Sequence, residues 1–288
     1  MIINKIAGTL LVLTLSLQVV FAQPVSEKKV VYSSPISRVW VLSVHVCDFA
    51  MHDSVFHFLT DKLGLPVEFY SEKYKNVYKN RRYAQVYAGN MFLEPCGPYT
   101  DIAYASKDFK AIFYGLNCES ERAIPSLADD LRGRSFAIKQ TSRVQVVDTA
   151  IIKQNVYFNI SPQAAINKKH IDSLLMKMET NNKGNLGIER IKEIRVGYTD
   201  DYSLERWKDF IKPSILSKKG LWKINDDHSI RFIKSSIKEV DAIVFKVKSL
   251  KMAKKYLIDN NMMGDISKKE ISLDKSKTFG LSILLSEE

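Results

Sequence analysis

Hydrophobic residues along this chain form short continuous runs and helical stripes that alternate in a fixed order. The first run, Val39–Cys47, is nearly all apolar and rich in valine, which predicts a buried strand. Next, apolar residues recur at helical spacing until Gly64 and Pro66, which predicts a helix capped by Asp53. Three further strands are predicted at 67–70, 83–88 and 91–94, the last two joined as a hairpin. The pattern therefore predicts strand, helix, strand, strand, strand.

This order returns three times, which makes it an internal repeat at the level of pattern rather than identity. The second copy is predicted as a strand at 110–116, a helix at 120–131, and strands at 135–139, 144–152 and 156–160. Two shorter copies follow, with strands at 194–198, 221–224, 229–233, 242–247, 269–273 and 279–285, and helices at 204–216 and 250–260. The segment Asn155–Asn159 can be laid over Asn90–Glu94, so Asn159 falls at the position of Glu94.

The repeat and its interruptions predict an α+β protein of two domains, each built from a pair of βαβββ modules. A polar helix at 163–181 and the linker 181–185 separate the two pairs. We divide the chain into a signal peptide (1–22), a leader (23–37), an N-terminal domain (38–162, modules 38–100 and 108–162), a connector (163–190) and a C-terminal domain (191–288, modules 191–236 and 240–288).

The first 22 residues have the pattern of a secretory signal. Lys5 supplies a positive start, 6–20 is an apolar run, and Ala22 ends a small-residue cleavage site. The run is shorter than the ~20 residues of a spanning helix, although an uncleaved anchor is the alternative. The residue immediately after Ala22 is not a cysteine, which argues against a lipid anchor, and no later apolar run is long enough to span a bilayer. We therefore expect an exported, soluble protein, periplasmic or secreted, that does not associate with a membrane after cleavage.

The formal net charge is +11, and cleavage of the signal lowers it by one. A basic protein can bind nucleic acid, anionic membranes or acidic ligands. The lysines are scattered in local pairs such as Lys168-Lys169, without interleaved aromatic residues. Together with export, this predicts a solvated basic surface and no nucleic-acid partner.

Several segments resemble the vicinal oxygen chelate superfamily, which includes glyoxalase I, extradiol dioxygenases and bleomycin-resistance proteins. The segments are His45-Val46, Phe58–Pro66, Gly89–Glu94, Phe113–Leu116, Leu131–Gly133, Gly184–Arg190 and Phe245–Leu250, with Ala253 and Tyr256-Leu257. They cover about residues 39 to 286 and look like a four-module, glyoxalase-like subgroup of uncharacterised function. The resemblance implies that modules pair into curled, cup-shaped mixed sheets around a small-molecule ligand.

In metalloenzymes of this superfamily the ligands come from the first and last strands of paired modules. Carried over, this implies His45 and Glu94 as metal ligands in the first module. An imidazole and a carboxylate suit one divalent ion such as Zn, Fe, Mn or Ni. Such an ion with open positions would chelate neighbouring oxygens of a substrate and stabilise an enolate or a similar anion.

The other modules depart from this ligand pattern. Asn159, at the position of Glu94, is a neutral donor that binds such ions poorly, so it is at most an auxiliary ligand. The comparable positions of the third and fourth modules are Gly197 or Tyr198, Ile233 or Lys234, Lys246 and Leu285. Two protein ligands are fewer than the three usual in catalytic sites. The predicted site is therefore half-open, completed by Asn159 and water, or without metal.

Cys47 follows His45 by two residues and Cys96 follows Glu94 by two, so each cysteine faces the same side of its strand as the candidate ligand. The resemblance implies that the two strands are neighbours. Three alternatives stay open, namely a Cys47–Cys96 disulfide, two auxiliary thiolate ligands, or unpaired buried thiols.

Weaker candidates surround this pair. Arg82, before the third strand, is a candidate to bind an anionic group of a ligand, and the alternative is a solvated loop residue. Tyr87 and Tyr114 are candidates to line a cup, and the alternative is ordinary packing in the sheet. His45 could also be the partner of a buried Glu94 without any metal. Three functions follow: a metal-dependent lyase, isomerase or dioxygenase; a non-catalytic protein that binds or sequesters a small ligand; or a degenerate structural member.

Overall fold

The computed structural model describes residues 34–70, 82–98, 111–153, 157–162, 167–181, 186–214 and 216–288, all within one compact unit, Tyr32–Glu288. The predicted signal peptide, most of the leader and most of the linker 181–185 lie outside these ranges. In the described part, no helix is both long and apolar enough to cross a membrane.

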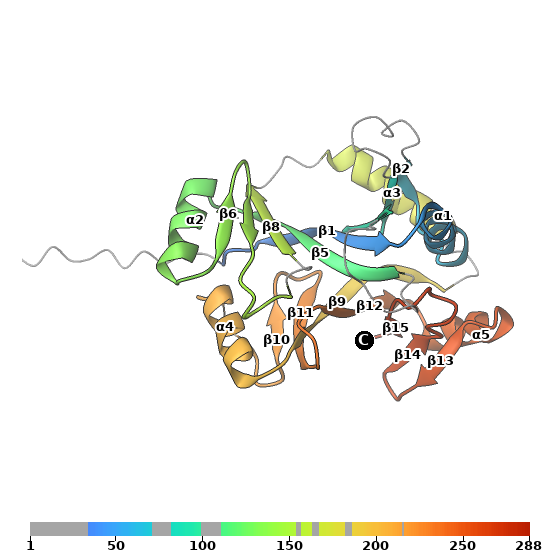
Figure 1. The fold of residues 1–288 in the computed structure, drawn as a ribbon. Helices are drawn as coiled ribbons and strands as arrows, with labels where there is room; N and C mark the ends of the chain where they lie inside the picture. The colour runs from blue at the N-terminus through green and yellow to red at the C-terminus, as the bar shows by residue number, and fades with distance from the viewer. Residues whose placement is uncertain are drawn as a thin grey trace, which may run out of the picture. The chain divides into compact units, whose positions relative to one another are not determined.

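The N-terminal half forms one eight-stranded mixed sheet from two modules. Its elements are β1 (Arg38–Val46), α1 (Phe49–His57), the π-helical turn η1 (Phe58–Lys62), β2 (Val67–Tyr70), β3 (Arg82–Tyr87), β4 (Phe92–Gly97), β5 (Ala111–Ser120), α2 (Ile124–Gly133), β6 (Ile138–Gln140), β7 (Val144–Val146) and β8 (Tyr157–Pro162). The strand order is β2-β3-β4-β1-β5-β8-β7-β6. In each module the first strand pairs in parallel with the last, β1 with β4 and β5 with β8. The modules meet where β1 and β5 run antiparallel at the centre (Figure 1).

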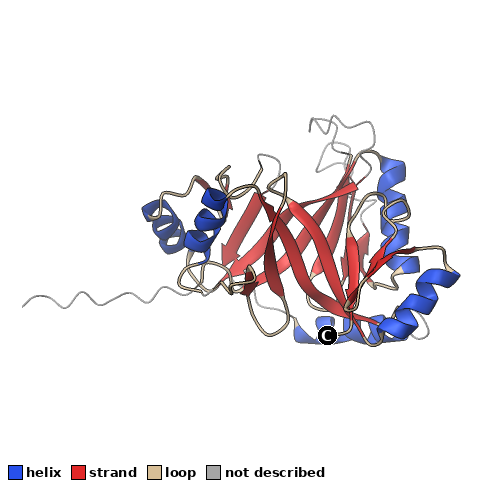
Figure 2. Ribbon diagram, turned by 90° about the horizontal axis from the view of Figure 1, so that it is seen from below, coloured by secondary structure: helices blue, strands red, loops and turns tan. Residues whose placement is uncertain are grey.

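The C-terminal half repeats this plan in a seven-stranded sheet. After α3 (Lys168–Asn181) come β9 (Ile188–Tyr198), α4 (Asp201–Ile211), β10 (Leu221–Lys223), β11 (Ser229–Lys234), β12 (Val240–Val247), α5 (Leu250–Asp259), β13 (Met263–Ile266), β14 (Glu270–Leu273) and β15 (Ile283–Ser286). The order is β10-β11-β9-β12-β15-β14-β13, with β9 and β12 antiparallel at the centre. Figure 2 shows the strands gathered in the middle with helices along the outside. The predicted α+β class and module order are therefore confirmed.

Some predicted element boundaries are wrong. Asp48, not Asp53, caps α1, because its side chain accepts a 2.6 Å hydrogen bond from the Met51 amide. The chain turns directly from β1 into the helix, so the earlier aspartate reaches the unpaired amides of the first turn. The strand predicted at 194–198 begins at Ile188, and the strand predicted at 144–152 ends at Val146. The last strand covers only 283–286, and β13 was not predicted.

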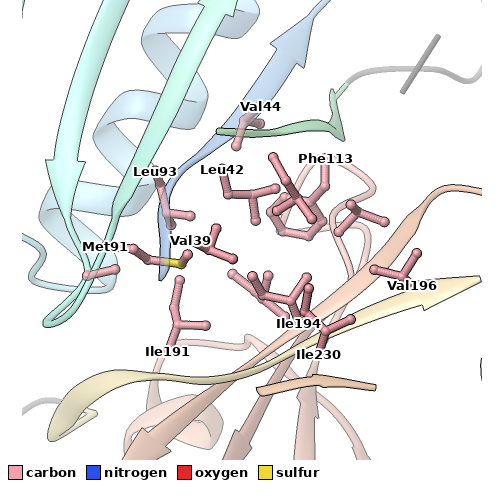
Figure 3. Packing of buried hydrophobic residues seen from close by; sticks show 14 of the residues in the cluster. Val39, Leu42, Val44, Met91, Leu93, Phe113, Ile191, Ile194, Val196 and Ile230 are labelled. Carbon is pink, nitrogen blue, oxygen red and sulfur yellow. The ribbon is translucent and has the colours of Figure 1, made fainter. Parts of the chain in front are cut away.

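The hydrophobic core lies between the two sheets. Figure 3 shows apolar side chains of β1, β4 and β5 facing those of β9 and β11. On β1 these are Val39, Leu42 and Val44, and all three are fully buried. Burying each such side chain stabilises the fold by about 1.5–3 kcal/mol. A register shift between Val39 and Val41 lets Val39 share this face with Leu42 and Val44. Because strand side chains alternate, Ser43 and His45 then point to the opposite face.

Candidate functional site

The opposite face of β1 carries Ser43 and His45, flanked by core valines and leucines. The parallel register of β1 with β4 sets Ser43 beside Glu94 and His45 beside Cys96. The predicted pair thus shares one face of one sheet but in diagonal positions, with backbones about 8 Å apart from the rise of two residues and the spacing of neighbouring strands. We call the group Ser43, His45, Gln85, Glu94 and Tyr114 the polar face.

Glu94 is held by two neutral donors. Its Oε1 accepts a 2.9 Å hydrogen bond from Gln85 Nε2, and its Oε2 accepts a 3.3 Å bond from Ser43 Oγ. Among the described residues it forms no ion pair. Burial raises the pKa of the Glu94 carboxyl, and the two hydrogen bonds offset this only in part. The arrangement keeps an acid group on the sheet without a compensating cation.

His45 lies against an aromatic ring. Its side chain is 2 % exposed, and its ring stacks on Tyr114 with 3.6 Å between centroids and 15° between planes. Burial, and then the nearby Cys96, raises the pKa of the Tyr114 hydroxyl. Tyr114 comes from β5 of the second module, so the pair joins both modules of the sheet. This packing holds the imidazole ring in one orientation within the polar face.

The second module carries amides where the first carries a carboxylate. Asn159 lies opposite Asn117 in the register of β8 with β5, as Glu94 lies opposite Ser43. Asn159 Nδ2 donates a 2.8 Å hydrogen bond to Asn117 Oδ1. The two amides therefore satisfy each other, and Asn159 is engaged away from Glu94.

Two weaker candidates lie away from the His45–Glu94 pair. Arg82 donates to both oxygens of Asp53 at 2.7 and 2.6 Å, which ties β3 to α1. Burial alone would raise the pKa of Asp53, but the hydrogen bonds from Arg82 and Tyr70 lower it. Tyr87 donates to the Gly89 carbonyl at 2.7 Å and packs in a small apolar cluster below α3.

The Cys47–Cys96 disulfide does not form in the structure, where none of Cys47, Cys96 and Cys118, all among the described residues, is part of a disulfide. The register sets Cys96 opposite His45, and Cys47 follows the end of β1, with its thiol 3.5 Å from Asp48 Oδ2. Burial and the neighbouring Asp48 raise the pKa of the Cys47 thiol, which disfavours the thiolate that a metal would need.

A three-ligand metal centre does not fit the residues present. Across the described ranges, no group of three His, Cys, Asp or Glu side chains is placed to hold an ion. Each oxygen of Glu94 accepts one hydrogen bond and keeps a free lone pair, and the His45 ring packs on Tyr114 about two residues further along the sheet. A catalytic ion usually has three protein ligands, so these two side chains do not form such a centre by themselves.

The C-terminal sheet carries a feature that the sequence reasoning missed. Glu193 on β9 accepts hydrogen bonds from Arg195 Nε at 2.8 Å and from Arg231 Nε and Nη2 at 2.8 and 2.7 Å. Arg195 also donates to Glu270 at 2.5 Å. We call these four residues the charged cluster. The alternation of charged residues with Ile194, Ile230 and Phe232 was the signal for it, because it marks one non-core face.

Comparisons with known proteins show similarity at the level of structure. No family model matches the chain, and no curated protein does. The 2,3-dioxygenase LapB from Pseudomonas sp. KL28 shares 10 % identity, with a TM-score of 0.54 over 88 % of this chain and 92 % of its own. A 4-hydroxymandelate synthase mutant from Streptomyces coelicolor shares 11 %, with a TM-score of 0.56 over 87 % and 92 %. A homoprotocatechuate 2,3-dioxygenase mutant from Brevibacterium fuscum shares 11 %, with a TM-score of 0.57 over 91 % and 74 %.

These proteins belong to the vicinal oxygen chelate superfamily, so the fold that the sequence resemblance implied is confirmed. Identity of 10 to 12 % establishes the architecture alone. The chemistry of this chain therefore has to be argued from its own side chains.

Proposed function

We propose that the protein binds a small oxygenated molecule on the polar face of its N-terminal module pair, without a resident catalytic metal. The observation that carries this is Glu94, a carboxyl group on a sheet face with only neutral donors around it. An acid group withdrawn from water costs several kcal/mol unless a cation compensates it. Side chains that lower the stability of the fold in this way are typical of ligand-binding sites.

Recognition would use the groups that surround Glu94. The carboxylate accepts hydrogen bonds from hydroxyl groups of a ligand, while Gln85 and Ser43 hold it in orientation. The half-buried ring of Tyr114, which stacks on the buried His45, supplies a flat apolar surface beside it. This combination suits a planar molecule with neighbouring hydroxyl or keto oxygens.

A second candidate function is a metal-dependent lyase, isomerase or dioxygenase. It is favoured by the fold shared with the named dioxygenases and by His45 and Glu94 on one face. In that case these two side chains would hold one divalent ion (Zn, Fe, Mn or Ni), and further ligands would have to complete it.

Metal analysis and ligand binding separate the two candidates. We expect purified full-length protein to contain no stoichiometric transition metal and to gain no thermal stability from added Zn²⁺ or Ni²⁺. We also expect it to bind catechol, which has two neighbouring hydroxyls, more tightly than phenol, and Glu94→Ala to abolish this difference. Glu270→Ala, on the other sheet, is the matched control. A bound metal that disappears in both His45→Ala and Glu94→Ala would overturn the proposal and favour the enzyme.

We also propose that the protein is exported by its first 22 residues. The charged start and apolar run support this. Expression of the full chain, followed by sequencing of the N-terminus of protein from outside the cytoplasm, tests it. A mature chain that begins just after Ala22 is expected, and an intact Met1 in the cytoplasmic fraction would contradict it.

A further inference from the structure

A second polar site lies where the two sheets of the unit meet. A cavity of about 440 Å³ opens between the start of β1, the β3–β4 hairpin, α3, the start of β9 and the β10–β11 turn. Its walls include Arg38, Tyr87, Arg190, Asp227 and His228. It shares no residue with the polar face around Glu94. We call it the junction cavity.

The hairpin and β9 hold the junction cavity in shape. Gly89 has a φ of +89°, and a Cβ there would lie 2.0 Å from the Glu189 carbonyl oxygen, so only glycine allows this approach. Asn90 then bridges the two strands, since its Nδ2 donates to the Ile191 carbonyl at 2.8 Å and its Oδ1 accepts from the Ile191 amide at 3.2 Å. The close approach of Gly89 and the side-chain hydrogen bonds of Asn90 therefore hold the β3–β4 hairpin against the backbone of β9.

His228 lines this cavity and carries a hydrogen-bond donor without a partner among the described residues. Its side chain is 3 % exposed, and its Nε2 accepts a 3.2 Å hydrogen bond from the Val39 amide. Because Nε2 is the acceptor, the neutral ring carries its proton on Nδ1. That Nδ1 is buried and has no partner among the described residues. Burial lowers the pKa of His228 to about 4, so at neutral pH the ring offers one N–H that needs an acceptor.

Arg38 adds a charged donor. Its guanidinium lies 3.9 Å from the Trp40 ring centroid, and it makes no hydrogen bond or ion pair with the residues that the structure describes. Burial lowers the pKa of Arg38, while the fields of Glu119, Tyr87 and Asp227 oppose the change. A half-buried guanidinium with five donors and no bound acceptor is suited to a planar oxyanion.

The rest of the wall limits the class of ligand. Lys246 neutralises Glu189 at 3.0 Å, which leaves Arg38 and Arg190 as the cations of the lining and Asp227 as its remaining carboxylate, while Glu119, which does not line the cavity, also acts on Arg38. Ile171 and Leu175 of α3 form an apolar side. We propose that the junction cavity binds small organic carboxylates, with Arg38 and the Nδ1–H of His228 as donors to the carboxylate and α3 against the organic part.

Ligand-observed NMR on the full chain at pH 7 and constant ionic strength tests this proposal with benzoate, succinate and acetate. Benzamide, which has the shape of benzoate without the charge, is the matched control ligand, and inorganic phosphate is the competitor. We expect benzoate to bind and benzamide not to bind. Arg38→Met keeps an aliphatic side chain beside Trp40 and removes the guanidinium group. It should therefore weaken the affinity for benzoate at least about tenfold, the loss typical of one charge-assisted hydrogen bond.

Two further variants keep the test decisive. Arg132→Met removes an exposed arginine that does not line the cavity and should leave benzoate binding unchanged. Leu175→Trp fills the α3 side from a partly exposed position and should weaken benzoate even if Arg38→Met fails to fold. Failure of all three carboxylates to bind, equal binding of benzoate and benzamide, or unchanged binding in a folded Arg38→Met protein would overturn the proposal. Phosphate that displaces benzoate at an equal concentration would show a general oxyanion site and would also overturn it.

Discussion

Two glutamates, the half-buried Glu94 and the buried Glu193, lie one on each sheet and should respond in opposite ways to the same substitution. Glu193 lies on β9 and receives three hydrogen bonds from two arginines. Glu94 lies on β4 and receives two from neutral groups. Glutamine keeps the shape of either side chain and removes its charge. We predict that Glu193→Gln lowers the free energy of unfolding, and that Glu94→Gln leaves it unchanged or raises it slightly.

The expected change in the free energy of unfolding depends on whether the carboxylate compensates a neighbouring positive charge. Removing one partner of a fully buried ion pair costs about 3–5 kcal/mol. The side chains of Arg195 and Arg231 are 19 % and 30 % exposed and can reach water in part, which reduces the expected cost of Glu193→Gln to about 2–4 kcal/mol. In a unit of this size that corresponds to a fall in melting temperature of roughly 5–15 °C. For Glu94→Gln, the loss of a half-buried charge without a compensating cation predicts about 0 to 1 kcal/mol of stabilisation.

The pH dependence of Glu193 has a definite sign. Burial alone would raise the pKa of Glu193, but the hydrogen bonds from Arg231 and Arg195 outweigh it and lower the pKa. A carboxyl whose pKa is lowered by folding contributes stability above its unfolded pKa and loses it as the pH falls through the folded value. The gap between wild type and Glu193→Gln should therefore be full at pH 7 and narrow steadily below about pH 4, near the unfolded value for glutamate.

Urea unfolding, followed by tryptophan fluorescence and circular dichroism, measures these differences. Glu270→Gln is the internal control, because Glu270 contacts only Arg195 of the two arginines and its side chain is 26 % exposed. It should cost less than Glu193→Gln. If Glu193→Gln lowered the free energy of unfolding by no more than Glu270→Gln does, Glu193 would not be the carboxylate that compensates both arginines of the charged cluster. If Glu94→Gln cost 2 kcal/mol or more, Glu94 would be a structural residue and the proposed binding function would lose its main support.

Three further predictions test the fold. Leu42→Ala should lower the free energy of unfolding by about 2–5 kcal/mol in the same urea assay, because it opens a cavity between the two sheets; a loss below 1 kcal/mol would contradict the inter-sheet core. Gly89→Ala should be destabilising and should raise amide hydrogen exchange in the β3–β4 hairpin and at the start of β9, since its Cβ would collide with Glu189; unchanged exchange would refute that contact. Unfolded, unreduced protein should titrate with three free thiols, and a count of one would show a disulfide.

The sequence predicted the architecture well because the architecture depends on patterns that repeat. Apolar runs, helical stripes and turn residues recur in four modules, and their order alone determines the sheet topology of the resembled fold. The predicted cap failed for a local reason. Both Asp48 and Asp53 are good capping residues, and the choice depends on how abruptly β1 ends, which propensity does not encode. Similarly, β9 extends back to Ile188 because it pairs with β12, a contact distant in sequence.

The candidate site was predicted less completely, because a site depends on register. The sequence indicated that His45 and Glu94 share a face, but only strand pairing shows that Ser43 is the neighbour of Glu94 and Cys96 that of His45. The charged cluster was not predicted because the module pattern placed the candidate ligand position at Gly197, near the end of β9. Glu193 and Arg195 lie four and two positions earlier on the same strand. A shift of one or two residues along a strand changes which side chains meet.

The difference between the two sheets bears on where function resides. Each sheet has a non-core face at matching strands, β1 with β4 and β9 with β11, and each carries a glutamate there. On the C-terminal sheet Arg195 and Arg231 compensate the charge of Glu193, and both of its carboxylate oxygens accept hydrogen bonds from them. On the N-terminal sheet Glu94 has only Gln85 and Ser43, so an outside donor would improve its surroundings. A ligand that brings hydroxyl groups therefore gains more interaction energy at Glu94 than at Glu193, which already has two charged donors, and this favours the N-terminal face as the binding face.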